Sequence, residues 1–144
     1  MALTKVLVVE DDNDIRNAYV FALMQAGFQV AQSSDGGEAI SALDRDVPDV
    51  IVLDMLMPGV SGLDFLRQTG ITTKYPKTKI VALSNIETPR VREQAQQLGV
   101  AEYIIKVNTT PHQMVDIVRK YAAMSPPPGA APAAGSAPAT PPKA

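Results

Sequence analysis

Polar side chains follow the short apolar runs of this sequence at places where they could do chemistry together. Glu10 and Asp11 come directly after the run VLVV, and Asp54 follows VIVL. Two later apolar runs lead into Ser84 and Lys106. Clustered carboxylates repel one another unless a cation lies between them, and an oxygen-only ligand set suits Mg²⁺ rather than zinc. If the fold brings these groups together, they predict a magnesium site with an ammonium and a hydroxyl beside it.

The chemistry expected of such a site is phosphoryl transfer. Mg²⁺ takes one or two carboxylates and fills the rest of its shell with water and phosphate oxygens. Positioning and charge neutralisation supply most of the catalysis of phosphoryl transfer, and a metal, an ammonium and a hydroxyl provide both. Asp54 is then the candidate nucleophile, because a carboxylate that attacks phosphorus forms an acyl phosphate. Asp11 and Glu10 are the candidate metal ligands.

Aliphatic runs that alternate with helical patterns must position these groups. The runs are apolar on both faces, which is typical of parallel strands, and Gly or Thr-Pro marks several helix ends. The pattern predicts an α/β sandwich in which the carboxyl ends of the strands line one crevice. The expected strands are Val6–Val9, Gln29–Ser33, Val50–Leu53, Ile80–Leu83 and Tyr103–Ile105, and the expected helices are Asp14–Ala26, Gly37–Asp44, Gly62–Thr69, Thr88–Leu98 and Pro111–Met124.

The candidate site residues belong to an ordered set of motifs. These are the pair Glu10-Asp11 after the first apolar run, Asp54-x-x-Met57-Pro58 with Gly62 four residues on, Ser84, and Tyr103-x-x-Lys106. The set resembles the receiver domains of bacterial two-component response regulators, and the resemblance covers residues 3 to 124. It implies a flavodoxin-like (βα)5 three-layer sandwich with a parallel five-stranded sheet of order 2-1-3-4-5.

The resemblance also implies a role for each residue of the site. Asp54 would accept a phosphoryl group, in a Mg²⁺-dependent reaction, from a phosphohistidine on a sensor histidine kinase or a phosphotransfer protein. Asp11 would bind Mg²⁺ directly with Glu10 as its partner, and Asp54 and the backbone carbonyl of Leu56 would complete the protein ligands. Lys106 would pair with Asp54 and then with the phosphoryl oxygens. The chain would catalyse only its own phosphorylation and dephosphorylation, so we do not expect an enzyme.

A conformational switch is implied by the same resemblance. The Ser84 hydroxyl would move to bind the phosphoryl group, and the Tyr103 ring would swing inward when it does. A local change of charge would thereby bias a bistable element. The responding surface would comprise the fourth expected helix, the fifth strand and the fifth helix. It would bind a downstream protein partner, and it could pair two copies of the chain.

One position departs from the family pattern. Val107 stands after Lys106, where receivers usually have a proline in a cis peptide bond. A cis bond before a non-proline residue costs about 2.5–4 kcal/mol, so we predict a trans bond and a rerouted loop that leads to Pro111. The departure keeps open a degenerate receiver that binds proteins without being phosphorylated. A phosphatase is disfavoured because Leu56 stands where its second carboxylate would lie, and a flavodoxin-type binder because the loop EDDND would repel phosphate.

Neighbouring residues suggest a long-lived phosphoryl group. Leu56, Asn85 and Ile86 flank the path by which water would reach phosphorylated Asp54, and neither Leu56 nor Ile86 can orient a water molecule. We therefore expect slow self-dephosphorylation. Two further acids, Asp12 and Asp14, are interpreted as caps of the first helix. The only histidine, His112, is interpreted as solvated.

Composition limits the other possibilities. The chain has 144 residues, 46% of them hydrophobic, which predicts one domain over residues 1–124. Residues 125–144 contain no aliphatic side chain larger than Ala and predict a disordered tail, so we expect a single-domain regulator. A net charge of −2 with scattered Lys and Arg gives no footprint for nucleic acid. Without cysteine, or a run long enough for a signal peptide or membrane span, the chain is expected to be cytoplasmic.

Overall fold

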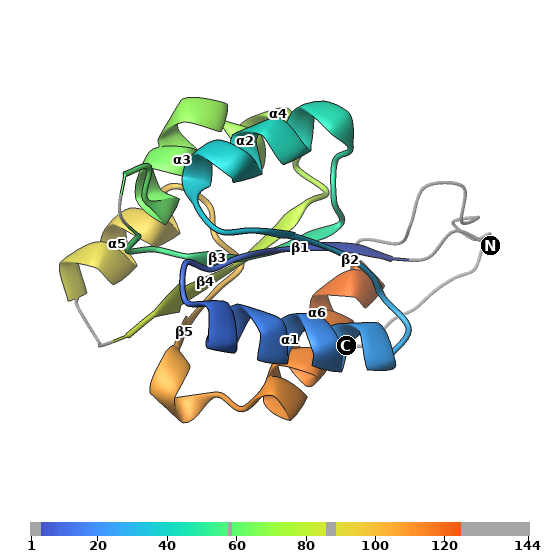
Figure 1. Ribbon diagram of the computed structural model, residues 1–144. Helices are drawn as coiled ribbons and strands as arrows, with labels where there is room; N and C mark the ends of the chain where they lie inside the picture. Colours follow the sequence, from blue (N-terminus) through green and yellow to red (C-terminus); the bar gives the residue numbers. More distant parts are fainter. Residues whose placement is uncertain (1–3, 58, 86–88, 125–144) are drawn as a thin grey trace.

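Five parallel strands form one sheet in the order β2-β1-β3-β4-β5 (Figure 1). The computed structural model describes residues 4–57, 59–85 and 89–124. The strand order confirms the flavodoxin-like fold expected from the sequence. The strands are β1 (Lys5–Val9), β2 (Gln29–Ser33), β3 (Val50–Asp54), β4 (Lys79–Ser84) and β5 (Glu102–Ile105).

The register of the central strands brings their carboxyl ends to one edge of the sheet. β1 pairs with β3 so that Val9 lies beside Leu53, and β3 pairs with β4 so that Asp54 lies beside Leu83. Every residue of β3 is buried, as its continuous apolar run predicts. The edge strand β2 buries only Ser33 fully, which agrees with its weaker, alternating pattern.

Helices cover both faces of the sheet and make three layers (Figure 1). One face carries α2 (Gly36–Arg45), α3 (Gly62–Thr69), α4 (Ile71–Lys74) and α5 (Pro89–Gln97), and the other carries α1 (Asn13–Gln25) and α6 (Pro111–Met124). The layers form because strand side chains point alternately to the two faces, and each apolar face needs a helical cover.

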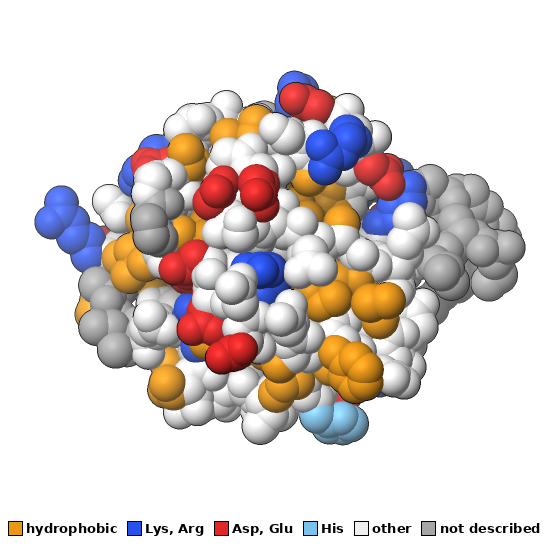
Figure 2. All heavy atoms as spheres, viewed as in Figure 1, with side chains coloured by type: hydrophobic (Ala, Val, Ile, Leu, Met, Phe, Trp, Pro, Cys, Tyr) orange, Lys and Arg blue, Asp and Glu red, His pale blue; other side chains and the backbone are white. Residues whose placement is uncertain are grey.

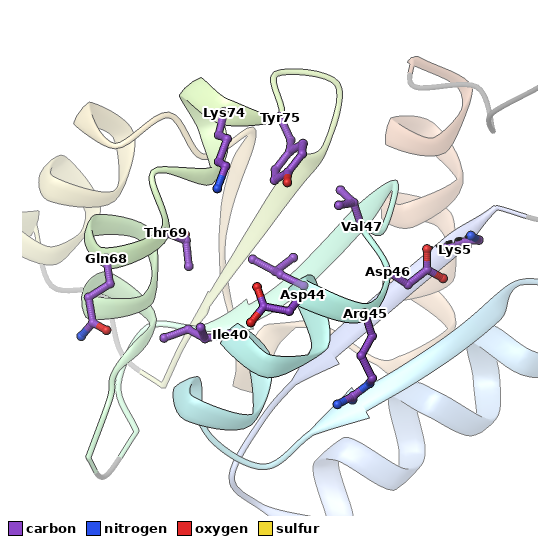
Figure 3. A pocket seen from close by; sticks show the side chains of 11 residues that line it. Lys5, Ile40, Asp44, Arg45, Asp46, Val47, Gln68, Thr69, Lys74 and Tyr75 are labelled. Carbon is purple, nitrogen blue, oxygen red and sulfur yellow. Dashed lines mark hydrogen bonds and ion pairs between the residues drawn. The ribbon is translucent and has the colours of Figure 1, made fainter.

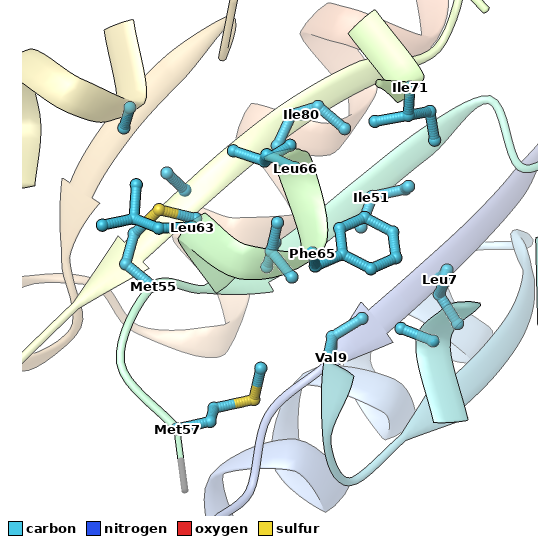
Figure 4. Packing of buried hydrophobic residues seen from close by; sticks show 14 of the residues in the cluster. Leu7, Val9, Ile51, Met55, Met57, Leu63, Phe65, Leu66, Ile71 and Ile80 are labelled. Carbon is cyan, nitrogen blue, oxygen red and sulfur yellow. The ribbon is translucent and has the colours of Figure 1, made fainter. Parts of the chain in front are cut away.

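Two hydrophobic cores result from this alternation. On one face, Phe65 of α3 and Ile71 of α4 pack with Leu7, Ile51 and Ile80 of the strands (Figure 4). Fully burying an aliphatic or aromatic side chain of this size contributes roughly 1.5–3 kcal/mol, so these contacts fix α3 and α4 on the sheet. The other core contains Val8, Val52, Leu83, Leu23 of α1, and Met114 and Val118 of α6.

Helix ends mostly follow the polar signals in the sequence. Asp12 is the N-cap of α1, and its side chain accepts a hydrogen bond from the Ile15 N–H at 2.9 Å, which confirms the capping role expected of it. Asp14 lies inside the first turn rather than at the cap. Gly70, with a φ of 57°, ends α3 in the left-handed conformation that glycine adopts without strain.

Two short helical segments were not predicted. α4 is a single turn, and a 3₁₀ turn spans Lys106–Asn108 directly after β5. Single turns show no hydrophobic period, so the pattern cannot reveal them. The Lys106–Val107 peptide bond is trans, which confirms that prediction.

Some expectations concern residues that the structure leaves undescribed. Residues 125–144, predicted to be a disordered tail, lie outside the described residues, as do Pro58, Ile86 and the expected helix start at Thr88. Among the described helices, none has the length and apolar character to cross a membrane.

Candidate functional site

Three acids meet at the edge of the sheet where β1 and β3 end. Glu10 follows β1 directly, Asp11 comes next, and Asp54 is the last residue of β3. Each offers a carboxylate oxygen, and these oxygens lie within 4.8 Å of one another. The predicted convergence of Glu10, Asp11 and Asp54 is therefore confirmed. Glu10 and Asp54 are buried, whereas Asp11 is exposed.

Lys106 brings a cation to the two buried acids. Its Nζ lies 2.9 Å from Glu10 Oε1, 3.2 Å from Glu10 Oε2 and 3.0 Å from Asp54 Oδ2. The predicted pairing with Asp54 is present, but the contacts with Glu10 were not foreseen. Burial by itself lowers the pKa of Lys106, yet its hydrogen bonds to Glu10 and Asp54 outweigh that effect and the pKa is raised. The ammonium is therefore charged at neutral pH.

Asp54 occupies a costly environment for a carboxylate. Its side chain is 1% exposed, and burial, together with the negative charge of Glu10, raises its pKa from 3.8 to about 7. Hydrogen bonds from Lys106 and from the Leu56 N–H oppose the rise. The Leu56 N–H donates to Asp54 Oδ1 at 3.1 Å. Because this carboxylate shares one cation with a second acid, a further positive charge nearby would stabilise its ionised form.

The backbone around Glu10 is held by several hydrogen bonds. Asp12 N–H donates to Glu10 Oε2 at 3.1 Å, and Arg16 Nη1 donates to the Glu10 carbonyl oxygen at 2.8 Å. The side chain of Asp12 points to the amides of α1 as its cap. The three-acid set that could hold a metal does not include Asp12.

Ser84 lies on β4, the strand next to that of Asp54, and Tyr103 lies one strand further on, on β5. Ser84 ends β4 with a fully buried side chain and pairs in register with Ile105. The Tyr103 ring, on β5, is 7% exposed, and the Arg92 guanidinium lies 4.6 Å from its centroid. Among the described residues, the Tyr103 hydroxyl is the buried side-chain group without a hydrogen-bond partner. The ring already lies inward in this structure, and its movement remains a prediction.

Two loops shape the entrance to the acid cluster. After β3 the chain exposes Leu56 and then turns back so closely that Gly62 meets the Asp54 carbonyl oxygen, where a Cβ would clash. After β5, Val107 projects into solvent with 79% of its surface exposed. An apolar cavity of about 340 Å³ opens beside Lys106. Its lining includes Ile15, Tyr19, Val107 and Pro111.

A larger cavity lies away from this chemistry. It measures about 720 Å³ and is lined by residues such as Lys5, Arg45, Asp46 and Tyr75 (Figure 3). Lys5 begins β1 and Arg45 ends α2, so this cavity is at the opposite end of the sheet from Asp54. In Figure 2, acidic side chains gather instead on the side where β1 ends and α1 begins. The clustered acidic side chains, and not the volume of the larger cavity, therefore locate the candidate site.

The donor set fits Mg²⁺. All three candidate ligand groups are carboxylates, which suit a hard divalent cation. Asp11 is exposed, so a cation can approach from solvent. The buried pair of Glu10 and Asp54 has Lys106 as its only cation among the described groups that hydrogen-bond to these side chains. These three acids could thus hold a divalent metal ion.

Comparison with known proteins agrees with this geometry. Residues 6–119 match the response regulator receiver domain family, and the chain therefore belongs to that family. Its fold and its acid cluster are those of a receiver domain of a two-component response regulator.

Curated relatives include two regulators. The chain is 37% identical over 105 residues to the phosphate regulon transcriptional regulatory protein PhoB of Klebsiella pneumoniae, an alignment that covers 71% of this chain and 44% of PhoB. It is 31% identical over 104 residues to the sensory transduction protein RegX3 of Mycobacterium tuberculosis (strain H37Rv), covering 72% of this chain and 44% of RegX3. The chain thus spans less than half the length of these relatives.

Solved structures show the same fold. The chemotaxis protein CheY4 of Vibrio cholerae superposes with a TM-score of 0.76 at 27% identity, covering 83% of this chain and 99% of that one. A LuxR-family DNA-binding response regulator from Staphylococcus aureus gives a TM-score of 0.74 at 28% identity, covering 83% of this chain and 98% of that one.

Proposed function

We propose that this domain is a phosphorylation-activated switch in which Asp54 accepts a phosphoryl group with Mg²⁺ present. The observation that carries the proposal is the shared position of Lys106, 3.0 Å from Asp54 and 2.9 Å from Glu10, beside the exposed Asp11. This arrangement offers a nucleophile, a fixed cation and ligands for a second cation in one place. Membership of the receiver family supports it.

The proposed reaction moves a phosphoryl group from nitrogen to oxygen. An Asp54 carboxylate oxygen attacks the phosphorus of a phosphohistidine whose other ring nitrogen carries a proton. A P–O bond forms as the P–N bond breaks, and the electron pair of that bond stays on the nitrogen of the departing neutral imidazole. Asp11, Asp54 and the Leu56 carbonyl would hold Mg²⁺, with Glu10 as the partner of Asp11, and the ion would supply positive charge for the transferred group. Lys106 pairs with the phosphoryl oxygens, and Ser84 donates a hydrogen bond to them. The domain catalyses no reaction beyond its own phosphorylation and dephosphorylation.

The donor is a sensor histidine kinase or a phosphotransfer protein, and the output is binding of a partner protein. The responding surface comprises α5, β5 and α6. Tyr103 belongs to β5, which pairs with the strand that ends at Ser84, and α5 and α6 cover opposite faces of the sheet. Two copies of the chain pair through the same surface. These events take place in the cytoplasm.

A degenerate receiver that only binds proteins is the second candidate, and Val107 is the observation that favours it. Yet the Lys106–Val107 peptide bond is trans, and the Lys106 ammonium still contacts Asp54. The missing proline therefore does not displace the ammonium. Phosphorylation therefore remains the better supported function.

The test is to incubate the protein with acetyl phosphate, a small phosphodonor, and follow intact mass. We expect a phosphoryl adduct that needs Mg²⁺, is labile in alkali and is lost in Asp54→Asn. Asp64→Asn, on α3, is the control and should keep the adduct. Absence of an adduct with any phosphodonor would favour the binding module, and turnover of phosphate esters would favour a phosphatase.

A further inference from the structure

Arg16 ties three segments of the chain together behind the acid cluster. Its Nη1 donates to the Glu10 carbonyl oxygen at 2.8 Å, its Nη2 to Asn13 Oδ1 at 2.6 Å, and its Nε to Gln32 Oε1 at 3.0 Å. Glu10 follows β1, Asn13 begins α1, and Gln32 belongs to β2. The guanidinium is planar and rigid, so three bonds from one fork fix the relative positions of all three segments.

The bond to Glu10 bears directly on Asp11. The Glu10 carbonyl belongs to the peptide unit that joins Glu10 to Asp11, so its hydrogen bond to Arg16 fixes the orientation of that unit. The following peptide unit is fixed by the Asp12 N–H, which donates to Glu10 Oε2 at 3.1 Å. Asp11 is therefore held by its backbone on both sides, although its side chain is exposed. Its carboxylate is placed beside those of Glu10 and Asp54 by these two peptide units.

We propose that Arg16 is a positioning residue for the cation site, holding Asp11 where its carboxylate can join those of Glu10 and Asp54. The proposal rests on the proposed function only in that this cluster binds a divalent cation. Residues behind metal ligands typically change metal affinity when they are substituted, because they set the orientation of the ligands.

Charge and positioning predict opposite results, which makes the proposal testable. Arg16 is a cation close to a cation site, so charge repulsion alone would make its removal strengthen metal binding. If Arg16 orients the Asp11 loop, its removal weakens metal binding despite the lost repulsion. The sign of the change in affinity thus separates the two effects.

The experiment is a titration of the full chain with Mn²⁺, with free Mn²⁺ followed by electron paramagnetic resonance. We expect Arg16→Ala to raise the dissociation constant for Mn²⁺ roughly tenfold. Arg16→Lys keeps the charge and one donor group, so its dissociation constant should lie between those of the wild type and Arg16→Ala. The matched control is Arg67→Ala, because Arg67 is exposed and contacts Asp64 on α3 at 3.9 Å. It should leave the dissociation constant within about twofold, since exposed pairs contribute little. An unchanged or lower dissociation constant in folded Arg16→Ala would overturn the proposal.

A second variant covers the case in which Arg16→Ala fails to fold. Gln32→Ala removes only the partner of Nε and should weaken Mn²⁺ binding by roughly two- to threefold, since one of three orienting bonds is lost. No change in Gln32→Ala would then count against the proposal. If the wild type never takes up phosphate but Arg16→Ala still weakens Mn²⁺ binding, the proposed function fails and this inference stands. If phosphate is taken up and Arg16→Ala binds Mn²⁺ like the wild type, only this inference fails.

Discussion

Lys106 donates hydrogen bonds to both carboxylate oxygens of Glu10, with its Nζ 2.9 Å and 3.2 Å from them, while it also contacts Asp54 at 3.0 Å. One ammonium thus offsets the charge of two buried acids. These three side chains depend on one another, because removing the Lys106 ammonium leaves two buried carboxylates without a counter-charge.

Lys106→Met should therefore destabilise the protein strongly. At pH 8 in EDTA we expect the free energy of unfolding to fall by about 3 kcal/mol, the cost of breaking a buried ion pair. At pH 5 the loss should be smaller, because Asp54, with its pKa near 7, is then protonated. Urea denaturation at both pH values measures this. Lys120→Met, which breaks an exposed pair with Glu102 on the surface, is the control and should cost no more than about 1 kcal/mol. Equal losses in the two variants would contradict the account.

Asp54→Asn should have the opposite effect in metal-free buffer. The pKa of Asp54 is about 7 in the folded protein and 3.8 in its ordinary state, so between these pH values the folded state holds a proton that the unfolded chain has lost. By linkage, this group makes the free energy of unfolding fall as pH rises from about 4 to 7. At pH 8 the substitution should raise stability by on the order of 1–3 kcal/mol, and at pH 4 by little.

Chemical denaturation across this pH range checks the prediction. Asp116→Asn, in an exposed contact with Arg119 at 3.9 Å, is the matched control and should change stability little at either pH. A gain at pH 8 that did not shrink at low pH would show that charge on Asp54 is not its cause. Adding Mg²⁺ should stabilise the wild type more than Asp54→Asn, since the variant lacks one ligand.

Much of this arrangement was predictable from the sequence because it follows from local patterns. Continuous apolar runs as short as Val50–Leu53 are typical of buried strands, and parallel strands place the residues after them at one edge of the sheet. The convergence of Asp54, Glu10 and Lys106 could therefore be predicted from the sequence. The strand order came from the resemblance to receiver domains, since periodicity alone does not order strands.

Other features were not predictable because they depend on side-chain conformation. The sequence did not show that Lys106 would bond to Glu10 as well as to Asp54, since the conformation of its flexible stem decides which acids it reaches. The role of Arg16 was also missed. The only available signal was an arginine one turn into a helix whose first residues follow the acidic pair. Side-chain hydrogen bonds to a backbone carbonyl leave no periodic trace in a sequence.

Gly62→Ala should loosen the loop that follows Asp54. A Cβ at this position would meet the Asp54 carbonyl oxygen and would lie 2.8 Å from Met55 Cα, so the backbone must shift. We expect a loss of roughly 1–3 kcal/mol in the free energy of unfolding, as for other overpacked sites. Gly37→Ala is the control, because the nearest atom to a Cβ at this position would be a side-chain oxygen of Asp35 at 3.2 Å rather than a backbone atom. Thermal denaturation compares them, and an equally stable Gly62→Ala would refute the close approach.

Leu56→Gln should shorten the life of the phosphoryl group. Leu56 is 47% exposed beside Asp54 and has no side-chain group that could orient an attacking water molecule. An amide at this position can hold a water near the phosphorus, so we expect loss of phosphate to be faster by roughly three- to tenfold. Leu56→Val, which keeps the side chain apolar, should retain the slow rate. Intact mass followed over time after removal of the phosphodonor measures both. If Leu56→Gln loses phosphate at the wild-type rate, the explanation for slow hydrolysis is wrong.

The most direct test of the central claim is to find the phosphorylated atom. After incubation with acetyl phosphate and Mg²⁺, borohydride reduces an aspartyl phosphate to homoserine, and peptide mass mapping locates the altered residue. The account predicts that the change lies at position 54 alone and disappears when Mg²⁺ is omitted. Reduction at another residue, or none with phosphodonor and Mg²⁺ in excess, would contradict it.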